Sequence, residues 1–167
     1  TFLKEVIHMF PEGCKVLDLG CGNGRNLHYL INNGYDAVGY EFSNIAISQA
    51  VTKNIYYKDL VKDEWDIGKF DVVIDFGFYH FYPTNKQHEY FTKLDSVLNT
   101  NGIYVNESAR LVGAPFKGNP LGYKPPQLCR SDFDIFDNYS KVVLNEGELP
   151  AHGDWKEYPC WQAVYKK

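Results

Sequence analysis

Apolar runs and helical stretches alternate along the first two thirds of the chain. Short apolar runs predict strands at 15–19, 36–41, 54–58, 70–76 and 103–106. Apolar residues at helical spacing predict helices over 1–10, 26–33, 43–52 and 86–99, with Ser43 as the N-cap of the third. Strands that alternate with helices are typical of a parallel sheet with helices packed on it.

The last third of the sequence follows a different pattern. Residues 107–126 are rich in Gly and Pro and predict a long loop, the best candidate for a lid, which contains Arg110, Phe116, Tyr123 and Lys124. A short helix is expected over 128–137. Strands at 141–145 and 161–166 should pair antiparallel, because the loop between them is too short for a crossover helix. The expected fold class is α/β: a doubly wound, mostly parallel seven-stranded sheet with an antiparallel last strand and helices on both faces.

A glycine-rich turn joins the first predicted strand to the helix at 26–33. It contains Gly20, Gly22 and Gly24. Glycines there let the backbone turn tightly and let a ligand approach the main chain. Three close glycines can simply make a tight turn, but the position between a buried strand and a helix favours a cofactor site.

Glu41 is the expected partner of this turn. It ends the second predicted strand, close to the ~20-residue interval at which such folds place an acid that binds a ribose. The alternative is a solvated glutamate at a strand end. The spacing GxGxG differs from the dinucleotide fingerprint GxGxxG, whose third glycine position holds Arg25 here. S-adenosylmethionine (SAM) has no pyrophosphate and needs no anion site, so it fits the turn better than a dinucleotide does.

Residues 16–26, VLDLGCGNGRN, resemble the first motif of the class I SAM-dependent methyltransferases. Segments similar to later parts of that family follow in the right order at 40–43, 58–60, 70–75 and 98–104. Two departures are visible. The ribose acid is Glu41 instead of the commoner Asp, and the turn LNTNG at 98–102 lacks the proline and first glycine of the family's LKPGG.

The resemblance implies a role for residues at the methionine end of SAM. Gly20 and Gly22 would pass close to the methionine part through their backbone groups. Asp18 would orient the amino group through water, and the backbone around Asp75 and Phe76 would meet the same end of the cofactor.

The resemblance also implies an adenosine site. Glu41 would bind the ribose hydroxyls, and Phe42 would lie against the adenine face. Asp59 would accept a hydrogen bond from the adenine amino group, with Leu60 packing nearby.

The methyl acceptor should lie beyond the fourth predicted strand, because ligands of open α/β sheets bind at the carboxyl ends of the strands. An aromatic segment follows there, and Tyr79 and His80 are its candidate catalytic residues. His80 has the ordinary pKa of a general base, but a packed structural histidine is an equal alternative. A soft nucleophile such as a thiol would need no base.

Composition and charge narrow the choice of acceptor. The net charge is −4 and no basic cluster occurs, which argues against nucleic acid as the substrate. The aromatic share of 16% indicates a core built on aromatic rings, or a pocket lined by them. No apolar run approaches the ~18 residues of a membrane span. The cysteines form no CxxC pair, and no metal site is expected.

The sequence thus predicts one methyltransferase domain over 1–167, with free thiols that indicate a cytoplasmic protein. The chain begins at Thr1 instead of Met, which leaves room for an upstream segment. The leading hypothesis is transfer of the methyl group of SAM to a small molecule. The alternatives are a protein or RNA methyltransferase and a SAM-binding module without catalysis; the oligomeric state stays open.

Overall fold

The computed structural model describes residues 1–110, 128–136, 138–149 and 158–167. Their strands form one seven-stranded sheet in the order β3-β2-β1-β4-β5-β7-β6. The strands are β1 (Lys15–Leu19), β2 (Asp36–Glu41), β3 (Ile55–Tyr57), β4 (Phe70–Phe76), β5 (Leu98–Ala109), β6 (Ser140–Leu149) and β7 (Tyr158–Lys166). Strands β1 to β5 are parallel, and β7 pairs antiparallel with both β5 and β6. The expected fold class is confirmed.

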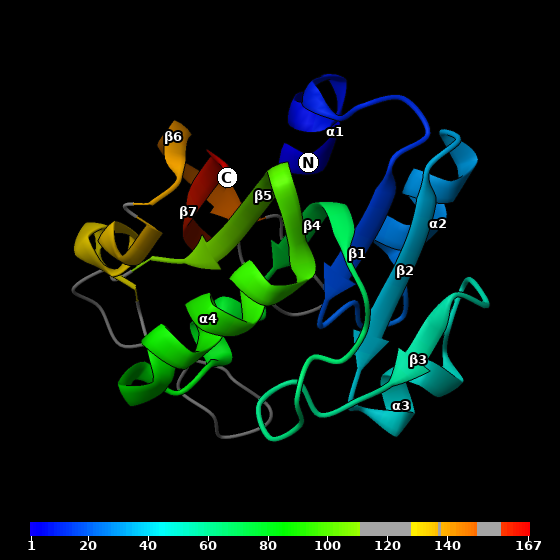
Figure 1. Cartoon of the computed structure of the whole chain (residues 1–167). Coiled ribbons are helices and arrows are strands. Elements are labelled where there is room, and N and C mark those ends of the chain that lie inside the picture. Colours follow the sequence, from blue (N-terminus) through cyan, green and yellow to red (C-terminus); the bar gives the residue numbers. More distant parts are fainter. Residues whose placement is uncertain (111–127, 137, 150–157) are drawn as a thin grey trace.

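Helices cover both faces of this sheet (Figure 1). The helical segments are α1 (Phe2–Val6), η1 (Ile7–Met9), α2 (Arg25–Asn32), α3 (Asn44–Ser48), η2 (Tyr79–Phe81), η3 (Thr84–Lys86), α4 (Gln87–Val97) and η4 (Arg130–Phe136), where η marks a 3-10 helix. Helices α1 and α2 bury their apolar residues with Val16, Val72 and Val105 on one face. Helices α4 and η4 bury theirs on the other face, in a cluster rich in Tyr and Phe.

Ser43 caps α3 as predicted: its hydroxyl oxygen accepts a hydrogen bond from the backbone N–H of Ala46 at 3.2 Å. The helix ends at Ser48, earlier than the expected end near residue 52. The turn before the fifth strand is also present. The pairing with β4 jumps from Leu98 to Ile103, and Asn101 between them has a φ of 63°.

Strand β5 continues beyond its predicted end at 106. Glu107, Ser108 and Ala109 pair with Gln162, Trp161 and Cys160 of β7, so the predicted loop at 107–126 was wrong at its start. Residues 111–127, which include Phe116, Tyr123 and Lys124 of the expected lid, lie outside the described residues. Strands β6 and β7 pair antiparallel as predicted, and both are longer than predicted, since the pairing runs from Ser140 with Lys166 to Leu149 with Tyr158.

The segment after the expected lid is close to its prediction. The short helix predicted over 128–137 is present as the 3-10 helix Arg130–Phe136, and Leu128 before it makes an isolated bridge with Arg110. In the part of the chain that the structure describes, no helix is long and apolar enough to cross a membrane.

Candidate SAM and acceptor site

The three glycines of the turn have different neighbours. All have positive φ angles: +64° at Gly20, +57° at Gly22 and +82° at Gly24. A Cβ added at Gly24 would lie 2.6 Å from Ile55, and one added at Gly20 would lie 3.0 Å from Phe78. A Cβ at Gly22 would meet nothing within 4 Å. The backbone at Gly22 therefore faces open space, as the approach of a ligand requires.

Glu41 connects this turn to the corner that follows β2. Its Oε2 accepts a hydrogen bond from the backbone N–H of Gly22 at 3.0 Å. Its Oε1 accepts from the N–H groups of Phe42 at 2.9 Å and Ser43 at 2.8 Å. A carboxylate has about four acceptor positions, so Oε2 retains one for a ribose hydroxyl.

Asp18 is buried at the carboxyl end of β1, with 1% of its surface exposed. Its Oδ2 has no hydrogen-bond partner among the described residues. Burial raises its pKa well above the ordinary range, and the nearby carboxylates of Asp75 and Glu41 raise it further. A buried acceptor beside two other acids favours a cationic ligand with a donor group. SAM carries both an ammonium and a sulfonium, so these residues fit it.

Asp75 uses its carboxylate inside the protein. Oδ1 accepts from the N–H groups of Phe78 at 2.8 Å and Tyr79 at 3.1 Å, and Oδ2 accepts from the hydroxyl of Tyr90 at 2.6 Å. Burial raises the pKa of Asp75 to about 6. The side chain fixes the turn after β4, which leaves the backbone at Asp75 and the half-buried Phe76 for the predicted contact with the cofactor.

The residues predicted to hold adenine differ in exposure. The Phe42 side chain is 62% exposed, so its ring is free for stacking. Leu60 is buried in the core, and its carbonyl accepts from the indole N–H of Trp65 at 2.9 Å. Asp59 accepts from the N–H of Val61 and pairs with the Lys62 ammonium at 3.0 Å. Its predicted bond to adenine stays a prediction.

His80 is buried behind the end of β4, with 5% of its surface exposed. Its Nδ1 accepts a hydrogen bond of 3.1 Å from the backbone N–H of Ala109 on β5. The neutral ring therefore carries its proton on Nε2. Burial lowers its pKa to about 4. This arrangement suits a hydrogen-bond donor better than a general base. The His80 ring lies beside Gly77, where an added Cβ would be 3.3 Å from Cε1 of the ring.

Tyr79, the other catalytic candidate, packs in the core. Its hydroxyl donates to the carbonyl of Asp132 at 2.8 Å, and its ring lies 4.8 Å from that of Tyr90 between centroids. Sequence reasoning missed three polar side chains nearby: Tyr90, Tyr104 and Asn106. Their hydrogen bonds connect α4 to β5, and no short-range pattern in the sequence signals such a connection.

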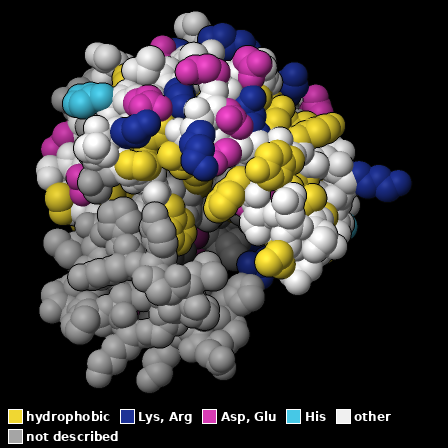
Figure 2. All heavy atoms as spheres, turned by 90° about the horizontal axis from the view of Figure 1, so that it is seen from below, with side chains coloured by type: hydrophobic (Ala, Val, Ile, Leu, Met, Phe, Trp, Pro, Cys, Tyr) yellow, Lys and Arg dark blue, Asp and Glu magenta, His cyan; other side chains and the backbone are white. Residues whose placement is uncertain are grey.

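The carboxyl ends of β1, β2, β4 and β5 lie on the lower edge of the sheet in Figure 1. Figure 2 views this side and shows a hollow bordered by hydrophobic side chains. In the described part of the chain, no group of three or more His, Cys, Asp or Glu side chains could hold a metal ion.

Comparison with known proteins agrees with this geometry. A family model described as a methyltransferase domain matches residues 16–102, about half of the chain. An uncharacterized methyltransferase of Schizosaccharomyces pombe is 39% identical over 85 residues, which cover 46% of this chain and 58% of that protein. The chain thus spans less than two thirds of the length of this relative.

Solved structures show the same fold. TehB from Haemophilus influenzae has a TM-score of 0.78 at 19% identity, over 99% of this chain and 61% of that one. The 1,6-didemethyltoxoflavin-N1-methyltransferase from Burkholderia thailandensis, solved with 1,6-didemethyltoxoflavin and S-adenosylhomocysteine (SAH), has a TM-score of 0.72 at 14% identity, over 99% of this chain and 76% of that one. With the family model, the seven-stranded sheet and the open glycine turn in agreement, the chain belongs to the methyltransferase-domain family of class I SAM-dependent methyltransferases.

Proposed function

We propose that this protein transfers the methyl group of SAM to a small-molecule acceptor bound at the carboxyl ends of β4 and β5. The observation that carries the proposal is the unpaired Oδ2 of buried Asp18, near the carboxylate of Glu41, which binds the open turn at Gly22 and keeps a free acceptor position. Together they offer a cationic nucleoside both charge and hydrogen bonds. The acidic composition and the absence of a basic cluster in the sequence favour a small molecule over nucleic acid.

When bound, SAM supplies an electrophilic methyl group on its sulfonium. The residues of the chain hold the reactants in place. Asp18 and the backbone of Gly20 and Gly22 would fix the methionine end, and Glu41 and Phe42 would fix the adenosine. Alignment of methyl and acceptor is a positioning effect worth ~7–11 kcal/mol at its best.

His80 would act on the acceptor through its Nε2–H. Because Nδ1 is held by the N–H of Ala109 at 3.1 Å, the ring presents a fixed donor at the end of β4. Such a donor can hold an acceptor atom in line without taking its proton. Tyr79 has no part in this proposal, since its ring and hydroxyl are both engaged in the core.

Tritium in the methyl group of SAM tests the proposal. Calorimetry first measures binding of SAM to the purified chain, where we expect micromolar affinity, about −8 kcal/mol. Labelled SAM is then incubated with the chain and a cell extract, and the extract is separated into small molecules, protein and RNA. Label among the small molecules supports the proposal.

The other outcomes identify the alternatives. Label in the protein or RNA fraction would indicate a macromolecular substrate. SAM binding without any transfer would indicate a binding module, and absence of SAM binding would overturn the proposal altogether. In the supported case His80→Ala should lower kcat by ~10²-fold, the usual cost of removing one positioned donor, while SAM affinity stays unchanged.

The cytoplasmic location remains part of the proposal. Cys14, Cys21, Cys129 and Cys160 are all free thiols in the structure. Free cysteines are typical of proteins in a reducing compartment.

A further inference from the structure

Unpaired polar atoms form a row at the end of β5. Among the described residues, four buried side-chain atoms have no hydrogen-bond partner: Asp18 Oδ2, Asn106 Oδ1, Ser108 Oγ and Arg110 Nε. Asp18 belongs to the cofactor site described above. The other three are alternate residues of one strand and its extension, so their side chains point to the same face of the sheet. Buried polar groups are nearly always paired, so such a row indicates a missing partner.

The row lies where a methyl acceptor is expected. Asn106 is opposite Asp75 on β4, and Ser108 is opposite Trp161 on β7. Strand β4 ends one residue after Asp75, and the side chain of His80 then binds the N–H of Ala109 in its place. The end of β5 is therefore at the carboxyl edge of the sheet, next to the cofactor residues of β4.

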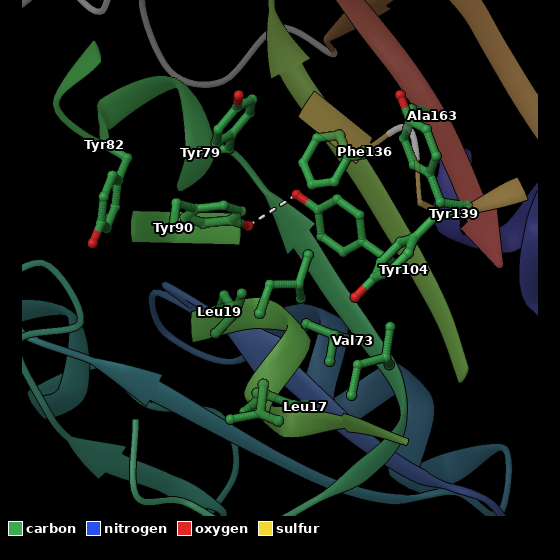
Figure 3. Close-up of a cluster of buried hydrophobic side chains, with 14 of the residues drawn as sticks. Leu17, Leu19, Val73, Tyr79, Tyr82, Tyr90, Tyr104, Phe136, Tyr139 and Ala163 are labelled. Carbon is green, nitrogen blue, oxygen red and sulfur yellow. Dashed lines mark hydrogen bonds between the residues drawn. The ribbon is translucent and has the colours of Figure 1, made fainter. Parts of the chain in front are cut away.

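A chain of hydrogen bonds fixes which way the Asn106 amide points. The ionised carboxylate of Asp75 can only accept, so the Tyr90 hydroxyl donates to it at 2.6 Å. The Tyr90 oxygen must then accept from the Tyr104 hydroxyl at 2.9 Å, a bond drawn in Figure 3. The Tyr104 oxygen in turn accepts from Asn106 Nδ2 at 2.9 Å. Asn106 Oδ1 is thereby left as the unpaired atom, and it can only accept.

We propose that Asn106 and Ser108 form the polar subsite of the methyl acceptor, and that the acceptor carries an N–H or O–H group next to a carbonyl-type oxygen. The inference rests on the proposed function and names its substrate class. The N–H or O–H group donates to Asn106 Oδ1, and the Ser108 hydroxyl donates to the neighbouring oxygen. Amides, lactams and hydroxy-carbonyl compounds have this pair of groups; thiols and other soft nucleophiles without a donor do not.

The probe for this subsite is 2-pyridone, which places an N–H beside a carbonyl. The matched control is N-methyl-2-pyridone, which keeps the ring and the carbonyl but lacks the N–H. Both are titrated by ligand-observed NMR into the SAH-loaded chain. We expect 2-pyridone to bind with a millimolar Kd and the control to bind ~10-fold more weakly, because one buried hydrogen bond is lost.

Two variants connect the binding to the named residues. Ser108→Ala removes an unpaired hydroxyl, so it should leave the fold intact and weaken 2-pyridone ~10-fold. Asp75→Asn acts from a distance. An amide at 75 donates to Tyr90, which reverses every hydrogen bond up to Asn106 and turns Asn106 Nδ2 toward the subsite. This variant should lose the preference for 2-pyridone over its control.

Asp71→Asn is the matched control for Asp75→Asn. Asp71 lies on the same strand, and its carboxylate accepts hydrogen bonds from the backbone N–H of Lys15 and from Asn99 Nδ2, away from the row. The control variant should keep the preference for 2-pyridone. Thermal unfolding confirms that each variant is folded. Equal binding of the two pyridones, no binding of either at about 10 mM, or a preference that survives both Ser108→Ala and Asp75→Asn would overturn the inference. Calorimetry with SAH alone separates this failure from failure of the proposed function, which would abolish SAH binding itself.

Discussion

The carboxylate of Glu41 accepts a hydrogen bond of 3.0 Å from the backbone N–H of Gly22. The two residues come from the ends of different strands, and the bond fixes the distance between the glycine turn and the corner after β2. Since Oε1 of the same side chain also accepts hydrogen bonds from the N–H groups of Phe42 and Ser43, Glu41 fixes the backbone of the proposed adenosine site as well as offering it an acceptor.

Glu41→Ala should weaken SAH by ~1–3 kcal/mol, because the ribose loses a charged acceptor and buried N–H groups are left unpaired. Calorimetry at neutral pH measures this loss. Glu64→Ala replaces an exposed acid and serves as the control, with no change expected. An affinity in Glu41→Ala equal to that of the parent protein would remove the ribose assignment.

Gly22→Ala and Gly34→Ala form a matched pair of substitutions. Gly22 has a φ of +57° and Gly34 a φ of +86°, and an added Cβ meets nothing within 4 Å at either position. Each alanine should therefore cost ~1–2 kcal/mol of backbone strain in chemical unfolding. Only Gly22→Ala should also lose SAH affinity, because its methyl group would occupy the approach of the ligand. Equal SAH binding in the two variants would place the cofactor elsewhere.

The backbone geometry of the proposed cofactor side could be predicted from the sequence because it is local. Gly20, Gly22 and Glu41 lie within one strand–turn–helix–strand unit, and the positions of glycine and acid follow from the backbone geometry. The parallel direction of the first five strands follows from the alternation of apolar runs with helices.

The acceptor side could not be predicted in the same way. The expected strand stopped at Asn106 because the Gly- and Pro-rich stretch after it predicts a loop, yet the polar residues Glu107 and Ser108 extend β5 and are buried. The Glu107 carboxylate accepts a hydrogen bond of 2.8 Å from the side-chain amide of Gln162, which lies 55 residues further along the chain. Hydrophobic periodicity cannot detect a polar residue that is buried with a distant partner. The same limit hid the hydrogen bonds from Asp75 to Asn106.

His80 should make the protein sensitive to acid. Its pKa falls from the ordinary 6.5 to about 4 on folding, through burial. A group with a lowered pKa contributes stability above its unfolded pKa and loses it as pH falls to the folded value. His80→Gln retains an acceptor for the N–H of Ala109. Between pH 6.5 and 4 its free energy of unfolding should fall by up to about 3 kcal/mol less than that of the parent protein.

Urea unfolding across that pH range measures the difference. His88→Gln, at an exposed position, is the control and should follow the parent curve. If His80→Gln also follows the parent curve, the imidazole is not buried in its neutral form.

Tyr90→Phe should destabilise the protein more at alkaline than at acidic pH. The Tyr90 hydroxyl donates to Asp75 at 2.6 Å and lowers its pKa, although burial still leaves that pKa raised to about 6. Loss of the donor raises the pKa of Asp75 further. A carboxyl group whose pKa is raised on folding lowers the free energy of unfolding as pH rises through its folded-state pKa. We expect a loss of ~1–3 kcal/mol at pH 8 and a smaller loss at pH 5, measured by urea unfolding.

Tyr82→Phe is the control for this substitution, because Tyr82 belongs to the same aromatic cluster but its hydroxyl donates to the half-exposed Glu89 at 3.2 Å. Water can replace that bond, so the loss should be small and similar at both pH values. A loss in Tyr90→Phe that is equal at pH 5 and pH 8 would mean that the hydroxyl does not stabilise an ionised Asp75. The proposed orientation of the Asn106 amide depends on that ionised carboxylate and would then be wrong as well.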